Sequence, residues 1–428
     1  GIKGELTIRV LNNAMSGGLR KVEFVPMFTF LNEQQKNLRL RDSALIIHKI
    51  ELIRDPQLKR LIEEEDQEGR LELLSSRPIL FSSPVLVMGK DGNWMVRWVS
   101  ERPGKSILKK EDGTVEELFS EDGVFSLPIS QSQVSFGLWQ ENSFLGHFEF
   151  KVPRIEDRLK VAIWGDSQGG WTTFSQLSKL ISEHQADLSI GAGDLVNNGS
   201  EEFGYVRFLQ SLSLMNTPQL PVPGNHDYDG YYEDLIPENL KRYVFQSESP
   251  TYGSYHFGPL AVLTLDPNSF FPVHLPEGSD QRKWAEKVLE SESWNNASWK
   301  MVVLHQPPYS QGWLGYQGEL AIRSFLEPYF HEGKVDLVVS GHTHDYERLT
   351  LNFSDHPVHF LVVGGAGGGL EPKGKDSDFP KMDMLIKEHH FGLLELDSVS
   401  LWLKVYGIQG QILDQFEFKK VSKDERGD

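Results

Sequence analysis

The sequence predicts an α/β sandwich of mixed sheets with helices outside, preceded by an all-β sandwich. From about residue 76 to 153 the pattern is entirely strand-like, with turn signals between the runs. From Leu159 onward, short apolar runs alternate with amphipathic stretches that fit helices. A chain of 428 residues also exceeds what one hydrophobic core usually supports, so two or three domains are expected.

Residues 1–75 are predicted to form a β-rich segment of unknown type. Strand-like runs such as ALIIHKIEL precede the charged helical stretch DPQLKRLIEEEDQEG. Within that stretch, Asp55 and Pro56 suit the N-cap and the first helical position. His48 is flanked by isoleucines, so it is interpreted as a strand residue rather than a metal ligand.

Residues 76–155 predict a small β-sandwich. Asp91-Gly92 and Asp112-Gly113 are hairpin turn signals. Trp94 and Trp98 are four residues apart, so both side chains point to the same face of one strand and are expected in the core. A carbohydrate-binding role for these tryptophans is the less favoured alternative.

Residues 156–428 predict the α/β domain. Helices are expected at 175–185, 201–214, 280–292 and 319–330, after which the chain returns to strands. The glycine-rich segment 362–370 lacks a following Lys-Ser/Thr pair, so it predicts a loop at a strand end and not a phosphate cradle.

Five apolar runs in this domain end in residues that can bind metal. They are VAIWGDSQ (161–168), LSIGAGD (188–194), LPVPGNHD (220–227), MVVLHQ (301–306) and VDLVVSGHTH (335–344). Open α/β sheets bind ligands at the carboxyl ends of their strands, so these ends should meet at one place. The converging set comprises two carboxylates, two amides and four imidazoles: Asp166, Gln168, Asp194, Asn225, His226, His305, His342 and His344.

That set is too large for one tetrahedral zinc and suits two metals that share a bridging carboxylate. Asp194 is predicted to be the bridge. Asp166 and His344 would complete one metal, with Gln168 as an additional oxygen ligand. The other metal would take the three remaining predicted ligands, Asn225, His305 and His342. Ligands of nitrogen and oxygen without sulfur suit Fe, Mn, Zn or Co, divalent or trivalent.

Two such ions would produce a bridging hydroxide near neutral pH and offset the charge of a phosphoryl group under in-line attack. His226 follows a predicted ligand and is expected beside the substrate, where it would stabilise the transferring group or protonate the leaving oxygen. Asp194 and His226 are therefore the predicted catalytic residues. Asn225, His226 and Tyr316 are the predicted substrate-binding residues.

The amino-acid composition limits which binding partners and which kinds of site are expected. A net charge of −18 argues against sequence-independent binding to nucleic acid or to an anionic membrane. The absence of cysteine excludes disulfides and thiolate metal sites. No apolar run reaches the length of a transmembrane helix. The chain opens with GIKGELTIRV rather than Met, which suggests a trimmed or mature form. The oligomeric state is left open.

In order, GD (165–166), GD (193–194), GNHD (224–227), His305 and GHTH (341–344) resemble the calcineurin-like metallophosphoesterase superfamily. GHTHDYER (341–348) and VVLHQPPYSQG (302–312) resemble its purple acid phosphatase branch more particularly. The strands at 76–153 are similar to the fibronectin type III-like domain that precedes the catalytic domain in that branch. The resemblance implies a four-layer α/β/β/α domain, a dinuclear centre of Fe, Mn or Zn, and phosphoester hydrolysis. It also implies a secreted or periplasmic location, while a cytoplasmic one is not excluded.

Three positions depart from the branch. Its members carry a Tyr ligand three residues after the bridging Asp, where this chain has Asn197. Many relatives have Asp-x-His where this chain has Asp166-Ser-Gln168. Plant-type members place further histidines about ten residues after the equivalent of His305, where this chain has GWLGYQGE, so Trp313, Tyr316 or Gln317 is expected to shape the substrate pocket.

The leading hypothesis is a phosphomonoesterase. Phosphodiester or nucleotide pyrophosphate hydrolysis on the same centre is the alternative, and a catalytically weak metal-binding scaffold is a third. The intact set of predicted ligands argues against the scaffold.

Overall fold

A computed structural model describes residues 60, 64, 78–89, 92–130, 133–153, 157–228, 237–245, 250–270 and 272–419. The predicted β-rich segment at 1–75 lies almost wholly outside the described residues, and so does Asp91 of the first hairpin signal. Within the described ranges no helix is both long and apolar enough to cross a membrane.

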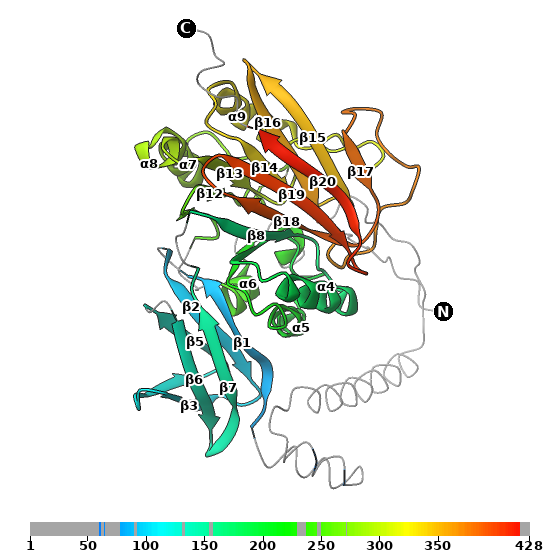
Figure 1. The fold of residues 1–428 in the computed structure, drawn as a ribbon. Coiled ribbons are helices and arrows are strands. Elements are labelled where there is room, and N and C mark those ends of the chain that lie inside the picture. Colours follow the sequence, from blue (N-terminus) through cyan, green and yellow to red (C-terminus); the bar gives the residue numbers. More distant parts are fainter. Residues whose placement is uncertain are drawn as a thin grey trace, which may run out of the picture.

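The N-terminal part is a β-sandwich of seven strands (Figure 1). They are β1 (Leu80–Met88), β2 (Trp94–Ser100), β3 (Gly104–Lys110), β4 (Val115–Ser120), β5 (Val124–Ile129), β6 (Gln133–Gln140) and β7 (Ser143–Lys151). One sheet has the order β4-β3-β6-β7. The turn between β3 and β4 contains Gly113 with a φ of 85°, which fits the predicted Asp112-Gly113 hairpin.

The other sandwich sheet, β1-β2-β5, continues into the α/β domain. β1 pairs with β10 (Gln219–Val222) through Val87 and Gln219, which gives one sheet with the order β20-β19-β18-β8-β9-β10-β1-β2-β5. Its other strands are β8 (Leu159–Trp164), β9 (Leu188–Ala192), β18 (His390–Leu396), β19 (Ser400–Gly407) and β20 (Ile412–Lys419).

A second sheet has the order β11-β12-β13-β14-β16-β15-β17. Its strands are β11 (Gly253–Phe257), β12 (Leu260–Thr264), β13 (Trp299–Val303), β14 (Leu337–Ser340), β15 (Tyr346–Phe353), β16 (His356–Val363) and β17 (Met384–Ile386). β8, β9 and β10 run parallel in the first sheet, and β12, β13, β14 and β16 run parallel in the second.

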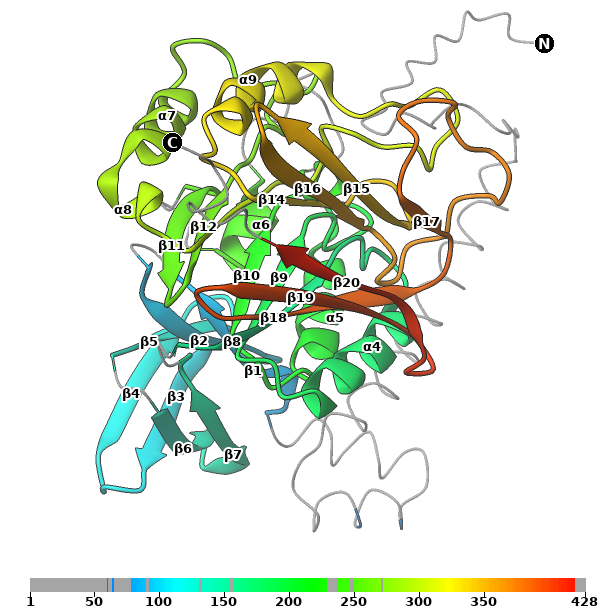
Figure 2. The same cartoon turned by 45° about the horizontal axis from the view of Figure 1, so that its top comes forward.

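Helices cover the outer faces of both sheets, so the domain has four layers, α/β/β/α (Figure 2). α4 (Trp171–Glu183), α5 (Glu202–Leu212) and α6 (Glu238–Tyr243) lie on the first sheet, and α7 (Asp280–Glu290), α8 (Glu292–Asn295) and α9 (Leu320–His331) lie on the second. The four predicted helices are confirmed, with ends shifted by up to four residues. The short helices α6 and α8 were not predicted.

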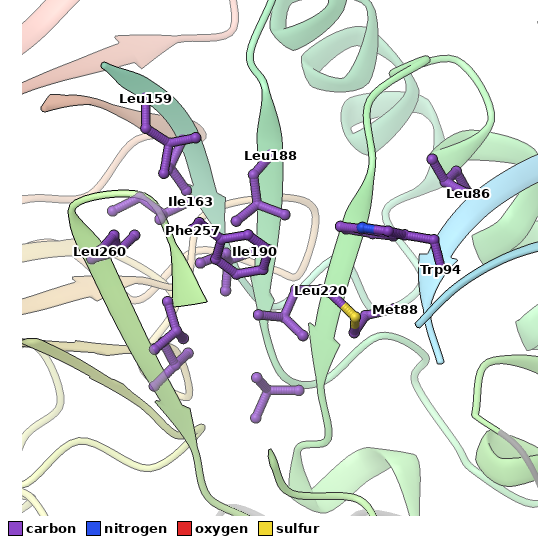
Figure 3. Packing of buried hydrophobic residues seen from close by; sticks show 14 of the residues in the cluster. Leu86, Met88, Trp94, Leu159, Ile163, Leu188, Ile190, Leu220, Phe257 and Leu260 are labelled. Carbon is purple, nitrogen blue, oxygen red and sulfur yellow. The ribbon is translucent and has the colours of Figure 1, made fainter. Parts of the chain in front are cut away.

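Apolar side chains of the two sheets face each other and form the central core. Ile163 and Ile190 of the first sheet share a fully buried cluster with residues such as Val262 and Met301 of the second. Figure 3 shows this packing where the sandwich joins it: Trp94 of β2 reaches Phe257 of β11, with ring centroids 6.4 Å apart. Trp98 is fully buried and stacks on Phe125. The prediction that both tryptophans fill the core is confirmed.

Candidate metal centre

The eight residues of the predicted converging set all lie just after the carboxyl ends of parallel strands. Asp166 and Gln168 follow β8, and Asp194 follows β9. Asn225 and His226 lie in the one-turn helix η2 (Asn225–Asp227) after β10. His305 follows β13, and the pair His342 and His344 follows β14.

The chain turns sharply at three of these strand ends. Asp166, Asp194 and His342 have φ angles of 59°, 51° and 75°, a left-handed backbone that few non-glycine residues adopt. Neighbouring glycines give the carboxylates room. A Cβ on Gly224 would lie 2.3 Å from Asp194 Oδ1, and a Cβ on Gly341 would lie 2.3 Å from Asp166 Oδ2. The glycines of the GNHD and GHTH motifs are therefore needed for close packing around the two aspartates.

Asp166, Asp194 and His344 form a compact cluster, in which one potential ligand atom of each lies within 4.8 Å of the others. His344 Nε2 lies 3.5 Å from Asp166 Oδ1. Both aspartates are almost completely buried. Such a site is well suited to a cation because it brings negative oxygens together away from water.

Gln168 borders this cluster with its amide nitrogen. Its Nε2 lies 3.2 Å from Asp194 Oδ2 and 2.8 Å from His344 Nε2. An amide nitrogen has no free lone pair for a metal, so Gln168 acts here as a hydrogen-bond donor. For Gln168 to act as a ligand, the amide must rotate so that its oxygen faces the cluster; that role stays a prediction.

The remaining predicted ligands have other contacts: His305 contacts Asp194, His342 contacts His305, and Asn225 in η2 accepts a hydrogen bond from Gln306. His305 Nε2 is 3.2 Å from Asp194 Oδ2, and the His305 and His342 rings meet edge to face at 5.1 Å. The other oxygen of Asp194 accepts a 2.8 Å hydrogen bond from the backbone N–H of His226. His305 thus contacts the same Asp194 oxygen that Gln168 contacts from the cluster; a role for Asp194 as a ligand shared by two metals stays a prediction.

The imidazoles of His305 and His344 are oriented with Nε2 toward the aspartates. His305 Nδ1 donates to the carbonyl of Ala192 at 2.9 Å, and His344 Nδ1 donates to that of Gly369 at 2.7 Å. The Gly369 carbonyl belongs to the glycine-rich segment, which is a loop after β16, as predicted. Carbonyl acceptors of this kind fix the ring tautomer at metal sites.

The residues fit a metal because buried lone pairs oppose each other. In neutral His305 the Nε2 lone pair faces the Asp194 carboxylate, and among the described residues this nitrogen has no hydrogen-bond partner. A proton is one solution: although burial lowers the pKa of His305, the charges of Asp194 and Asp166 raise it to about 9. A metal cation is the other, since it replaces that proton between the same atoms.

His226 holds a different position. Its Nδ1 lies 2.9 Å from the carbonyl of Asn197, so Nε2 is the ring nitrogen left for other contacts. The ring is half-buried, unlike that of His305. Asn197, where the resemblance leads one to look for a tyrosine, thus contributes its backbone oxygen to orient His226.

Sequence reasoning missed a hydrogen-bond network behind Asn225. Gln306 Nε2 donates to Asn225 Oδ1 at 3.3 Å and to Asn268 Oδ1 at 2.7 Å. Asn268 in turn donates to Asp266 Oδ1 at 2.8 Å. Asp266 ends the run LAVLTLD (260–266), so the signal that identified the other strand ends was present here too.

Asp227, the last residue of GNHD, was also missed. Its buried carboxylate accepts hydrogen bonds from the backbone N–H groups of Leu195 and Gly224 and from Tyr205 Oη. Burial, together with the nearby charge of Asp194, raises its pKa to about 8. Asp227 joins the loop after β9 to the loop after β10.

Tyr316 lies against His342, with ring centroids 5.3 Å apart. Its hydroxyl donates to Glu319 Oε1 at 3.0 Å, and the side chain is buried. Any contact with substrate would therefore involve the ring rather than the hydroxyl, and that contact stays a prediction.

Comparison with known proteins agrees with this geometry. Residues 159–346 match the family model of the calcineurin-like phosphoesterases. Purple acid phosphatase 21 of Arabidopsis thaliana is 28% identical over 265 residues, which cover 57% of this chain and 58% of that protein. Purple acid phosphatase 1 of Ipomoea batatas is 31% identical over 245 residues, or 51% of each chain. The chain thus spans between about half and six tenths of the length of these curated relatives.

Among solved structures, purple acid phosphatase PPD1 from yellow lupin (Lupinus luteus) seeds aligns with a TM-score of 0.66 at 16% identity, over 82% of this chain and 76% of that one. PhoD aligns with a TM-score of 0.56 at 9% identity, over 81% and 92%. These two likenesses concern the fold.

Residues 159–346 are therefore a domain of the calcineurin-like phosphoesterase family, the class that the fold and the site define. Within that class, the two curated relatives named above are purple acid phosphatases. The resemblance to this family and to its purple acid phosphatase branch is confirmed, while the fibronectin type III-like identity of the sandwich stays a prediction.

Proposed function

We propose that the chain is a metal-dependent phosphoesterase that hydrolyses phosphomonoesters at a dinuclear centre. The observation that carries the proposal is the opposition of buried His305 Nε2 and Asp194 Oδ2, next to the cluster of Asp166, Asp194 and His344. A closed structural metal site usually has four protein ligands, and the set of potential ligands here is larger.

In this proposal two cations would share Asp194. Asp166 and His344 would hold one of them, and Asn225, His305 and His342 would hold the other. The bound cations would supply an acidified water and a positive charge for the phosphoryl oxygens. The identity of the metals, Fe, Mn or Zn, is left to measurement; a homologue of Arabidopsis thaliana is named Fe(3+)-Zn(2+) purple acid phosphatase 12.

His226 acts on the substrate in this proposal. The Asn197 carbonyl accepts the Nδ1 proton, so His226 would act as the imidazolium, whose Nε2–H donates a proton to the leaving oxygen or a hydrogen bond to the phosphoryl group. Since the backbone N–H of His226 also binds Asp194, the imidazole is fixed relative to the shared carboxylate.

Hydrolysis of phosphodiesters or of nucleotide pyrophosphates is the alternative, because the same centre serves all three. A metal-binding scaffold with weak catalysis is the third possibility. The proposed location is secreted or periplasmic, and a cytoplasmic location is the alternative.

The test combines metal analysis with two assays. Purified protein is loaded with Mn²⁺, Zn²⁺ or Fe, the metal content per chain is measured, and hydrolysis of p-nitrophenyl phosphate is compared with that of bis(p-nitrophenyl) phosphate. We expect two metals per chain and faster hydrolysis of the monoester. A faster diester reaction would select the alternative, and two bound metals without hydrolysis of either compound would select the scaffold.

A matched pair of variants ties the activity to the site. Asp194→Asn should abolish hydrolysis. Asp397→Asn should leave it unchanged, because the Asp397 carboxylate accepts N–H groups in the turn between β18 and β19, away from the strand ends that carry the site.

A further inference from the structure

An apolar segment lies directly beside the candidate metal centre. Trp313, Leu314 and Tyr316, which we call the apolar wall, lie in the loop between β13 and α9. The ring centroids of Trp313 and Tyr316 are 5.9 Å and 5.3 Å from that of His342. The two aromatic rings are 5.5 Å from each other. The wall thus reaches a predicted metal ligand through ring contacts.

The loop that carries the wall is held in place by hydrogen bonds to its backbone. Ser377 Oγ lies 2.9–3.0 Å from the carbonyls of Trp313 and Tyr316, which share its single proton, and it accepts a 3.0 Å hydrogen bond from the N–H of Gly315. Lys387 Nζ donates to the carbonyl of Gly312 at 2.9 Å. A surface that is fixed before binding loses little conformational entropy when a ligand arrives.

The two rings of the wall differ in exposure. Tyr316 is buried and its hydroxyl donates to Glu319, so it packs against Trp313 and offers no exposed surface of its own. Trp313 is only half-buried, and Leu314 next to it is 65% exposed. Trp313 therefore has free indole surface within ring-contact distance of a predicted ligand.

The wall is also free of charge. Residues 312–318 read GWLGYQG, with no ionisable group other than the Tyr316 hydroxyl, in a chain of which 24% is charged. A charged leaving group, such as that of a phosphopeptide or a second phosphate, would find no partner on this segment. A neutral, planar leaving group would find an aromatic surface to stack on.

We propose that the apolar wall binds the leaving group of aryl phosphomonoesters, with Trp313 as the stacking residue. The proposal rests on the proposed function of the same site. Trp313 lies next to the predicted metal ligand His342, so it can contact a ring that is joined directly to the ester oxygen. A nucleobase fits less well, because a ribose separates it from the phosphate.

The test measures binding apart from catalysis. Titration calorimetry with the metal-loaded protein compares phenylphosphonate with methylphosphonate, two compounds that share the anionic group and cannot be hydrolysed as esters. We expect phenylphosphonate to bind about 2- to 12-fold more tightly, the range of one aromatic pair. Trp313→Ala should remove that preference while leaving methylphosphonate binding unchanged, and Trp313→Phe should restore most of it.

Trp402→Ala is the matched control. Trp402 is 45% exposed on β19 and lies beside the amino ends of β8 and β10, at the opposite edge of the sheet. Its loss should leave the preference for phenylphosphonate intact. If the wall only packs against His342, Trp313→Ala should weaken the binding of both phosphonates equally. That result would overturn the proposal.

Other outcomes are equally decisive. Equal binding of both phosphonates by the unaltered protein, with hydrolysis of p-nitrophenyl phosphate retained, would overturn the aryl subsite and leave the proposed function standing. Binding of neither phosphonate, with no hydrolysis of any ester, would overturn both. Tighter binding of adenosine 5′-monophosphate than of phenylphosphonate, lost in Trp313→Ala, would assign the wall to a nucleobase and overturn the aryl assignment.

Discussion

Asp194 and His305 face each other across the two sheets, with Oδ2 and Nε2 3.2 Å apart. Asp194 follows β9 in the first sheet and His305 follows β13 in the second, so the pair forms only when the sheets pack face to face. The remaining nitrogen of His305 is held by the carbonyl of Ala192, which lies in β9 itself. The end of β9 thus positions the imidazole of His305, which follows β13 in the other sheet.

Asp194→Ala should release both metals, because this carboxylate is the proposed shared ligand. Asn225→Ala should mainly loosen one metal, since Asn225 is a terminal ligand in the proposal. Elemental analysis after dialysis against a graded chelator measures both effects. One metal per chain at saturating Mn²⁺ in the unaltered protein would contradict the shared role of Asp194.

The iron-loaded protein should be colourless or pale. The purple colour of the branch comes from a tyrosinate ligand, and the position three residues after Asp194 is Asn197, whose carbonyl binds His226. Visible absorption spectroscopy checks this. A strong purple band would mean that another tyrosine reaches the iron, and Tyr228→Phe and Tyr346→Phe would then identify it.

The site shows which features the sequence could predict. A ligand at the end of a buried strand is a local feature, so Asp166, Asp194, His305 and the GHTH histidines could be found from short runs. The network of Gln306, Asn268 and Asp266 could not be found in the same way. It depends on hydrogen bonds between loops far apart in sequence, although the run LAVLTLD ending at Asp266 was a usable signal.

The fold shows a similar division. Alternating patterns predicted the strands and helices because periodicity reflects which face of each element is buried. The continuation of the sandwich sheet into the α/β domain was not foreseen. It rests on the pairing of Val87 with Gln219, and backbone pairing between distant strands leaves no trace in local periodicity. Contact of Trp94 with Phe257 is a consequence of that pairing.

His226→Ala should keep a near-normal metal content while kcat falls by about 10²–10⁴-fold. The ring binds Asn197 through Nδ1 and is not among the proposed metal ligands. If it protonates the leaving oxygen, the loss should be smaller for nitrophenyl phosphate than for alkyl phosphates, because nitrophenolate needs little protonation. Equal losses across leaving groups would limit His226 to charge stabilisation, and lost metal would make it a ligand.

Gln306→Leu should weaken binding of one metal by about 10- to 100-fold, the usual effect of removing a residue that orients a ligand. Gln306 donates to Asn225 Oδ1, and that oxygen has a second lone pair for the metal. Competition with a fluorescent chelator measures the affinity. Gln415→Leu, at an exposed position on β20, is the control and should have no effect. Equal affinity in Gln306→Leu and the unaltered protein would show that Asn225 needs no such support.

His359 should make the fold acid-sensitive at a point away from the metal centre. It lies buried on β16, 3.0 Å from Thr350 Oγ1 and packed against Phe416 and Phe418. Burial, followed by the nearby charges of His356 and Arg348, lowers its pKa to about 4. The neutral form is the one that fits the fold, so its contribution to stability is complete above about pH 6.5 and is lost as the pH falls toward 4.

Between pH 7.5 and 5 this single group should reduce the free energy of unfolding by about 2 kcal/mol. The side chain introduced by His359→Gln cannot titrate but can still hydrogen-bond Thr350. Between the two pH values, the free energy of unfolding of this variant should therefore fall by about 2 kcal/mol less than that of the unaltered protein. Urea unfolding at the two pH values measures the difference. His147→Gln, at an exposed site on β7, should follow the unaltered protein. If His359→Gln shows the same pH dependence as the unaltered protein, the acid sensitivity arises from other groups.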